Sequence, residues 1–307
     1  MKSPFQEFVA APVMTALLVV ACGTSNPLAT PPDGGGGGGG GGGGVVPPLG
    51  HVVVVVEENT DYASVIGNAS MPYLNGLARQ YALAANYHAN THPSIGNYFM
   101  LTVGRIVSNN DSYSSVVTDD NIVRRLISGR KTWKSYAEDL PSVGYTGGDV
   151  GRYARKHNVI ALLSDVVNDP AQQRNLVPFT QFAADLANNA LPDYAFVVPN
   201  ECNDAHDCPL GTADAWLKTN IDPLVKNPQF QRDGLLVIVF DEADSDNTDG
   251  GGHVACVIVS PKAKRGYEST TLYQHQSVLR LTGEALGLGS LPNDAATAPD
   301  MGEFFQP

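Results

Sequence analysis

Short apolar runs alternate with amphipathic stretches along most of the chain. Four runs are continuous and rich in β-branched residues, which is typical of strands buried on both faces. The predicted strands cover residues 51–56, 194–198, 235–240 and 254–259. The predicted helices between them cover residues 71–87, 98–103, 121–127, 133–140, 179–190, 212–224 and 274–286. Buried strands separated by helices predict an α/β fold, with a mostly parallel central sheet and helices on both faces.

The first residues of the chain follow a different pattern. Lys2 precedes an apolar stretch over residues 13–20 that is too short to span a bilayer, which is typical of an export signal. Small residues before Cys22 predict a bacterial lipoprotein signal peptide over residues 1–21, with Cys22 as the lipidated first residue of the mature chain. Secretion without a lipid and a merely apolar N-terminus are the alternatives.

Residues 22–48 are rich in proline and glycine and contain an unbroken glycine run over residues 34–44. Glycine has no side chain to bury and the most backbone entropy to lose, so we expect a flexible tether here. Residues 49–307 have the size of one large α/β domain and contain no further linker or internal repeat. The expected location is the bacterial cell envelope, periplasmic or at the cell surface, where the lipid anchor makes a membrane the partner.

The charge balance narrows the choice of ligand. The formal net charge is -12, with 19 basic and 31 acidic residues that are scattered along the chain. This disfavours a nucleic acid as partner, because its phosphate backbone is bound by clustered basic residues. A small phosphorylated ligand would need local positive charge, and in so acidic a protein a bound cation is the obvious source.

The cysteines agree with export. Cys202 and Cys208 lie close enough in the sequence to close a short disulfide loop in an oxidising compartment. Cys256 lies in an apolar run, which is typical of a buried thiol rather than a reactive one.

Polar residues follow three of the four predicted strands. The clusters are Glu57-Glu58-Asn59, residues 199–206 and Asp241-Glu242. Ligands of open parallel sheets bind beyond the carboxyl ends of the strands, so we expect the three clusters to converge on one edge. Taken singly, each cluster could be an ordinary solvated loop start, since Asp, Asn and Glu are common there. Their repetition at three strand ends favours a site.

The side chains of these clusters predict a metal site. Glu58, Asn59, Asp241 and Glu242 offer hard oxygen atoms, which suit Ca²⁺, Mg²⁺ or Mn²⁺ and do not suit a thiolate-type zinc site. Glu58 is preferred to Glu57 because it adjoins Asn59. The alternative is that both acidic pairs lie at the surface.

Ser94 is the candidate nucleophile. Pro93 is typical of a helix start, where free N–H groups and the positive end of the helix dipole can hold a phosphoryl group. Asn97 lies one turn further on, where its amide is expected to bind a phosphate oxygen of the substrate. The alternative for Ser94 is an ordinary helix N-cap, which is a common use of serine before a helix.

Several short motifs also occur in a characteristic order. They are Glu58-Asn59, Pro93-Ser94 with Asn97-Tyr98, Tyr153 with residues 155–158, Asn203-Asp204, His206-Asp207-Cys208, Asp241-Glu242 with His253, and His275 with Ser277. In this order they resemble the phosphoesterase family of bacterial phospholipases C and acid phosphatases, and above all its small lipoprotein members. The resemblance runs from about residue 51 to residue 305.

This resemblance implies an alkaline-phosphatase-like fold. It also implies a divalent cation held by the Glu-Asn and Asp-Glu pairs, with Ser94 as both nucleophile and metal neighbour. The larger phospholipases usually carry threonine at the position of Ser94 and a longer chain before the Asp-Glu pair. The substrate is therefore left open between a small phosphate ester and a phospholipid head group.

Hydrolysis through a phosphoserine intermediate follows from these assignments. His206 is the first choice to protonate the leaving oxygen, and His253 is the second. His157 and His275 could instead hold loops by hydrogen bonds. The alternative function is a non-catalytic lipoprotein that binds a phosphorylated ligand or a divalent cation and has no need of a serine nucleophile. A further alternative is a sulfatase or phosphodiesterase on a similar fold. Of these, a sulfatase is disfavoured because its Cys/Ser-x-Pro-x-Arg motif does not match the Pro-Ser order.

Overall fold

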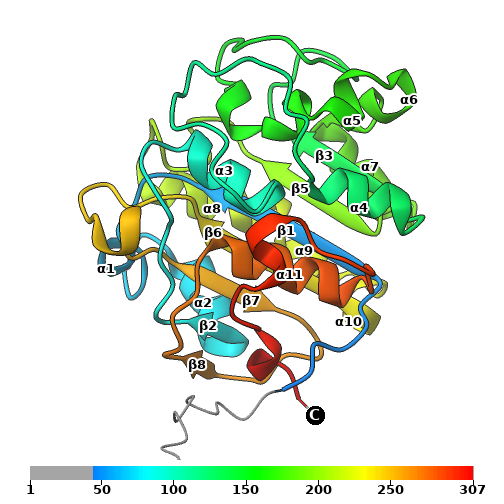
Figure 1. Ribbon diagram of the computed structural model, residues 1–307. Coiled ribbons are helices and arrows are strands. Elements are labelled where there is room, and N and C mark those ends of the chain that lie inside the picture. Colours follow the sequence, from blue (N-terminus) through cyan, green and yellow to red (C-terminus); the bar gives the residue numbers. More distant parts are fainter. Residues whose placement is uncertain (1–43, 307) are drawn as a thin grey trace, which may run out of the picture. The chain divides into compact units, whose positions relative to one another are not determined.

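The computed structural model describes residues 44–306 (Figure 1). The predicted signal peptide over residues 1–21, the lipidation site Cys22 and the tether up to residue 43 lie outside the described residues. Within the described part, packing into the core begins at Val46, which is 8% exposed and lies slightly before the predicted domain start at Leu49. No helix in residues 44–306 has the length and apolar character needed to cross a membrane.

One eight-stranded sheet runs through the domain in the order β4-β3-β5-β1-β6-β7-β2-β8. Its strands are β1 His51–Glu57, β2 Ala82–Ala84, β3 Trp133–Ala137, β4 Leu176–Pro178, β5 Tyr194–Val198, β6 Gly234–Phe240, β7 Cys256–Val259 and β8 Tyr267–Ser269. All neighbouring strands are parallel except β7, which runs antiparallel to both β6 and β2. The predicted mostly parallel α/β sheet is therefore confirmed.

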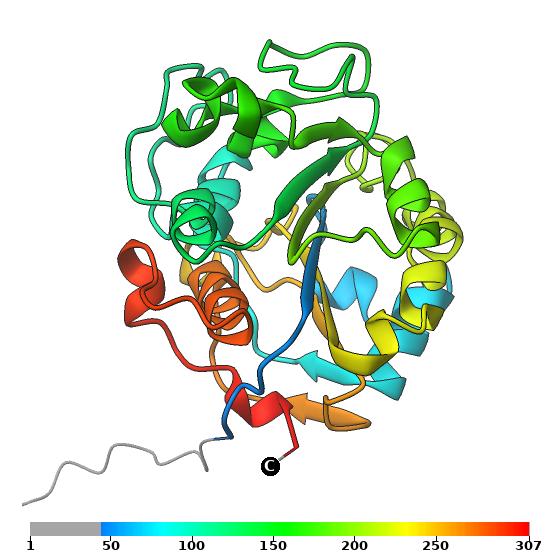
Figure 2. The same ribbon diagram turned by 90° about the vertical axis from the view of Figure 1, so that its right-hand side faces the viewer.

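Helices cover both faces of this sheet (Figure 2). The helices are α1 Tyr62–Val65, α2 Pro72–Gln80, α3 Ile95–Thr102, α4 Ile122–Ser128, α5 Ser164–Val167, α6 Pro170–Gln173, α7 Thr180–Ala187, α8 Leu210–Asn220, α9 Asp222–Lys226, α10 Phe230–Asp233 and α11 His275–Ala285. On one face α3 packs against α11, and on the other α2 packs against α8. The apolar stripe of each helix thereby meets a sheet that is buried on both sides.

The centre of the sheet positions the polar clusters. β1 carries five consecutive valines, all at most 2% exposed, and pairs in parallel with β5 on one side and β6 on the other. The pairing runs along β1 and β6 as far as Glu57 opposite Phe240, so both strands end at the same level. The residues that follow β1 and β6 are therefore brought to one edge of the sheet.

Two predicted helices are partly or wholly wrong. Residues 133–140 form strand β3 followed by a turn, because Trp133 and Tyr136 imitate helical spacing while the backbone pairs with both β5 and β4. The helix predicted over residues 71–87 ends at Gln80, and the chain continues as the short strand β2 between β7 and β8. In both places tertiary pairing overrides the local pattern.

Candidate active site

Ser94 lies at the start of α3, but its side chain does not cap the helix. The hydroxyl is 1% exposed and can donate to either of two carboxylates, Glu242 Oε1 at 2.9 Å or Glu58 Oε2 at 3.2 Å. A hydroxyl has one proton, so it bonds to one carboxylate at a time and keeps lone pairs free. The N-cap alternative is therefore not the one that the structure adopts, and Ser94 faces a cluster of acidic side chains.

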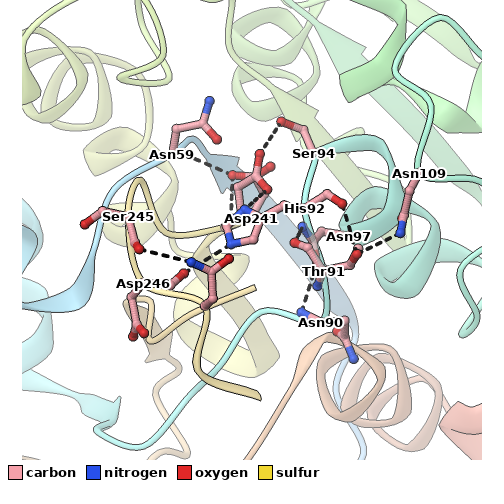
Figure 3. A network of polar contacts seen from close by, with 12 residues as sticks. Asn59, Asn90, Thr91, His92, Ser94, Asn97, Asn109, Asp241, Ser245 and Asp246 are labelled. Atoms are coloured by element: carbon pink, nitrogen blue, oxygen red, sulfur yellow. Dashed lines mark hydrogen bonds and ion pairs between the residues drawn. The ribbon is translucent and has the colours of Figure 1, made fainter. Parts of the chain in front are cut away.

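The carboxylates of this cluster come from the ends of two neighbouring strands. Glu58 follows β1, while Asp241 and Glu242 follow β6. Asp241 Oδ1 accepts the backbone N–H groups of Asn59 at 3.1 Å and Glu242 at 2.6 Å, which fixes the two loop starts to each other. Figure 3 shows the Asn59 and Ser94 side chains on the same side of Asp241. The structure thus brings the three predicted carboxylate ligands close to the predicted nucleophile and ties the backbone of Asn59 to Asp241.

Burial makes the negative charge of this cluster costly. It raises the pKa of Glu58 and Asp241 well above their usual range, and a neighbouring carboxylate adds to each shift, Asp241 for Glu58 and Glu242 for Asp241. Burial also raises the pKa of Glu242. Adjacent buried carboxylates need protons or a cation to offset their repulsion.

The donor set fits a hard divalent cation. Asp241 Oδ2 is buried and has no hydrogen-bond partner among the described residues. Buried polar atoms are normally partnered, so this oxygen is a candidate to bind a cation. The remaining donors are carboxylate, amide and hydroxyl oxygens, the types that Mg²⁺, Mn²⁺ and Ca²⁺ prefer. Across residues 44–306 no three His, Cys, Asp or Glu side chains are already arranged around a common point. The cation is therefore inferred from the chemistry of the donors.

His92 belongs to the site, although the sequence did not single it out. Its Nδ1 lies 2.6 Å from Glu242 Oε2, and its Nε2 lies 3.1 Å from the carbonyl oxygen of Asp246. His92 thereby links Glu242 to the loop after β6. Its position two residues before Ser94 was the only sequence signal that could have found it.

His157 is the second site histidine that the sequence left undecided. It is 1% exposed, with Nε2 3.3 Å from Glu58 Oε1 and Nδ1 3.5 Å from Asp204 Oδ2. Its ring stacks on Tyr98, whose hydroxyl donates to Glu58 Oε1 at 2.5 Å. Burial lowers the pKa of His157 well below its usual value. Together these side chains orient Glu58 from the side opposite to Ser94.

His206 reaches the same region from the loop after β5. Its side chain is 26% exposed, and its ring centre lies 5.9 Å from that of His157. Nδ1 lies 2.8 Å from Asp207 Oδ1, which leaves Nε2 available for another partner. Within the same loop, Asp204 Oδ1 accepts the backbone N–H of His206 at 2.9 Å. The predicted disulfide between Cys202 and Cys208 is present and closes this loop.

Opening this disulfide is expected to lower activity more than stability. In a variant with both Cys202 and Cys208 changed to serine, kcat/KM should fall about tenfold, because Asp204 and His206 lose the constraint that positions them. Treatment of the unchanged chain with a reductant should give the same loss. Cys256→Ser is the control, since this buried thiol lies outside the loop. Unchanged kcat/KM in the double variant would show that the loop is ordered without its covalent link.

Two predicted site residues do not reach the cluster. Asn97 is fully buried, and its amide is used by the backbone of Asn90 and Thr91: Oδ1 accepts both N–H groups and Nδ2 donates to the Thr91 carbonyl (Figure 3). In this structure Asn97 therefore shapes the loop before Ser94, and its contact with substrate stays a prediction.

His253 is likewise not placed as a proton donor. Its Nε2 donates to the carbonyl oxygen of Ala85 at 3.0 Å, and its ring is stacked between Tyr62 and His88. This stack anchors the loop after β6. His275 is also structural, because its fully buried ring bonds the carbonyl oxygen of Asp241 at 2.7 Å and the hydroxyl of Tyr87 at 3.0 Å.

The fold is alkaline-phosphatase-like. A serine at a helix start faces carboxylates at the carboxyl ends of central strands. The same fold occurs in a solved protein of the alkaline phosphatase superfamily from Vibrio parahaemolyticus. That likeness has a TM-score of 0.51 at 13% identity and covers 82% of this chain and 70% of the other. The chain belongs to the Phosphoesterase family, whose family model matches residues 68–289.

Curated relatives carry phosphatase names. The chain is 32% identical to the phosphate-repressible acid phosphatase of Penicillium chrysogenum over 76% of its own length and 58% of the relative. It is 34% identical to the phosphatidylinositol-3-phosphatase of Mycobacterium tuberculosis, over 76% of its own length and 75% of the relative. The chain thus spans little more than half the length of the fungal acid phosphatases that it matches.

Proposed function

We propose that this chain hydrolyses phosphate esters, with Ser94 as the nucleophile and a divalent cation held by Glu58, Asn59, Asp241 and Glu242. The observation that carries the proposal is the placement of the Ser94 hydroxyl between Glu58 and Glu242. A binding protein would need the oxygen ligands but no hydroxyl group held among them. Membership of the Phosphoesterase family supports the same reaction class.

Two side chains assist Ser94 in the first step, which is its attack on phosphorus. Glu242 accepts the Ser94 proton in its hydrogen bond, and His92 holds Glu242 from the other side. Ser94 Oγ then forms a bond to phosphorus while the ester oxygen leaves, so the enzyme carries a phosphoserine that water cleaves in the second step. A bound cation would withdraw electron density from the serine and phosphoryl oxygens, which makes a poor nucleophile reactive at neutral pH.

His206 is proposed to protonate the leaving oxygen. Its side chain is the partly exposed histidine of the loop after β5, and Asp207 fixes the orientation of its ring. A general acid needs this combination of a fixed ring and access to substrate.

The substrate class is a phosphate ester of a small molecule or of a phospholipid head group. The name of the mycobacterial relative includes a phosphorylated lipid, which supports the second possibility for this chain as well. We also propose that the protein is exported to the bacterial cell envelope and anchored there through Cys22, on the strength of the N-terminal sequence pattern and the disulfide.

The test is an assay of the purified full-length chain with aryl phosphate monoesters and diesters. Mg²⁺, Mn²⁺ and Ca²⁺ are added separately, and a parallel sample is dialysed against a chelator. We expect hydrolysis that chelation abolishes and one of the added cations restores. If activity survived thorough chelation, the proposed requirement for a divalent cation would be wrong. Absence of hydrolysis with every ester and cation, together with binding of phosphate, would favour the non-catalytic alternative.

A further inference from the structure

The start of α3 is already occupied by a carboxylate of the chain itself. Asp111 Oδ1 accepts the backbone N–H of Ile95, the residue after Ser94, at 3.2 Å. Its other oxygen, Oδ2, lies 3.3 Å from Nζ of Lys156. The helix-start amide that the sequence suggested as a free phosphate donor is thus bonded to an internal anion.

Asp111 comes from the loop over residues 103–121, which joins α3 to α4 without regular structure. Two neighbours hold this loop over the helix start. Asn109 Nδ2 donates to Thr91 Oγ1 at 2.8 Å, and the Tyr113 ring packs edge-on against Phe99 with ring centres 5.8 Å apart. The Asp111 side chain itself is 32% exposed. It can therefore swing toward solvent while its neighbours keep the loop in place.

The two groups that hold Asp111 are those that a phosphoryl group at Ser94 would use. An N–H at a helix start and a lysine ammonium are favourable donors to phosphate oxygens. Lys156 is 19% exposed and precedes His157, which contacts Glu58 on the far side of Ser94. In addition, Nε2 of the buried His157 has no hydrogen-bond partner among the described residues. Two donors suited to a phosphoryl group, the Ile95 N–H next to Ser94 and the Lys156 ammonium, are thus engaged by Asp111.

We propose that Asp111 occupies the position of a substrate phosphoryl oxygen and that the substrate must displace it to reach Ser94. This inference rests on the proposed function and adds a substrate preference to it. A phosphate monoester carries close to two negative charges at neutral pH, whereas a diester carries one. The ligand with the higher charge competes better with a carboxylate for Lys156 and the Ile95 N–H. Asp111 therefore favours monoesters over diesters.

The experiment compares the full-length chain with its Asp111→Asn variant. Binding of inorganic phosphate is measured by calorimetry in the presence of Mg²⁺ or Mn²⁺, and KM is measured for aryl phosphate monoesters and diesters. Asparagine competes less well for Lys156, so phosphate should bind about five- to tenfold more tightly, because more of the protein is already competent to bind. KM should fall for both esters, and kcat should change little. The KM ratio of diester to monoester should also fall, because asparagine no longer disfavours the ligand of lower charge.

Asp149→Asn is the matched control for a general loss of negative charge. Asp149 Oδ1 accepts the backbone N–H of Arg155 at 2.8 Å, so it lies near the same basic segment but does not touch α3. This control should change phosphate binding by less than about twofold. If both variants gained the same affinity for phosphate, the cause would be the loss of a nearby negative charge. The proposal that substrate displaces Asp111 would then be overturned.

Phosphate binding in Asp111→Asn that stays unchanged, or becomes weaker, would also overturn the inference. Asp111→Ser serves as the second variant if the asparagine variant unfolds, as judged by its melting temperature and circular dichroism. Calorimetry needs no turnover, so failure of the proposed hydrolysis and failure of the displacement are distinguishable. If the wild-type chain cleaves no ester but binds phosphate less tightly than the Asp111 variant does, only the proposed hydrolysis is contradicted, and the displacement by substrate stands.

Discussion

Replacing Ser94 with alanine should lower kcat for an aryl phosphate by about a thousandfold or more, because the covalent route loses its nucleophile. Phosphate binding should remain within about threefold of wild type, since the Ile95 N–H, Lys156 and the acidic residues are unchanged. The measurement is steady-state kinetics together with calorimetry. After an acid quench during turnover, mass spectrometry of the wild-type chain should show one added phosphoryl group on the peptide that contains Ser94.

Two variants control this result. Ser277→Ala removes another fully buried serine, which lies in α11 and whose hydroxyl has no hydrogen-bond partner among the described residues, so its kinetics should match wild type. Ser94→Thr retains a hydroxyl and should keep measurable activity. Full activity in Ser94→Ala, or phosphorylation of a different residue, would refute the assignment of the nucleophile.

The second large effect is expected at Asp241. Asparagine at this position should lower kcat/KM by about a hundredfold or more, because the cation loses a charged ligand. The chelated variant should be more stable than the chelated wild type by about 1 kcal/mol or more, since a buried and partly unpartnered carboxylate beside Glu242 is replaced by a neutral group. Steady-state kinetics measure the loss of activity, and thermal melts with and without added Mg²⁺, Mn²⁺ or Ca²⁺ measure the change in stability. Cations should raise the melting temperature of the wild type and not that of the variant.

Asp185→Asn provides a contrast of opposite sign. Asp185 is also buried, but its Oδ2 accepts hydrogen bonds from Lys134 Nζ at 2.5 Å and Tyr136 Oη at 2.6 Å, far from the strand ends that form the site. Loss of a well-partnered carboxylate should lower stability and leave both activity and the cation effect intact. A chelated Asp241→Asn variant that melts below wild type would contradict the view that the carboxylates repel each other without a cation.

Much of the fold could be predicted because its central strands consist of continuous runs of apolar residues. The five valines of β1 and the run in β6 allow little else than strands buried on both faces. The edges of the sheet were harder. β3 is short and mixes Lys134 and Ser135 with aromatic residues, and only its pairing with β5 and β4 makes it a strand. The antiparallel direction of β7 depends on the course of the preceding loop. The local pattern of apolar and polar residues does not predict that course.

The site shows the same division between regular and irregular backbone. Glu58, Asp241 and Glu242 were predictable because the ends of parallel strands must meet at one edge. His92 and Asp111 come from irregular segments, whose course depends on tertiary contacts such as that between Asn109 and Thr91. Sequence spacing placed Asn97 on one face of a helix but did not reveal that its amide bonds to backbone groups of the preceding loop.

The central position of β1 has a consequence for the order of events in folding. β1 is the first strand in the sequence, yet both of its partners, β5 and β6, come from the second half of the chain. Contacts between residues so distant in sequence form slowly, because a long stretch of chain must be ordered before they close. The acidic cluster, which needs the ends of both β1 and β6, can assemble only after that closure. Cation binding and activity should therefore appear late in refolding, after most of the helical structure has formed.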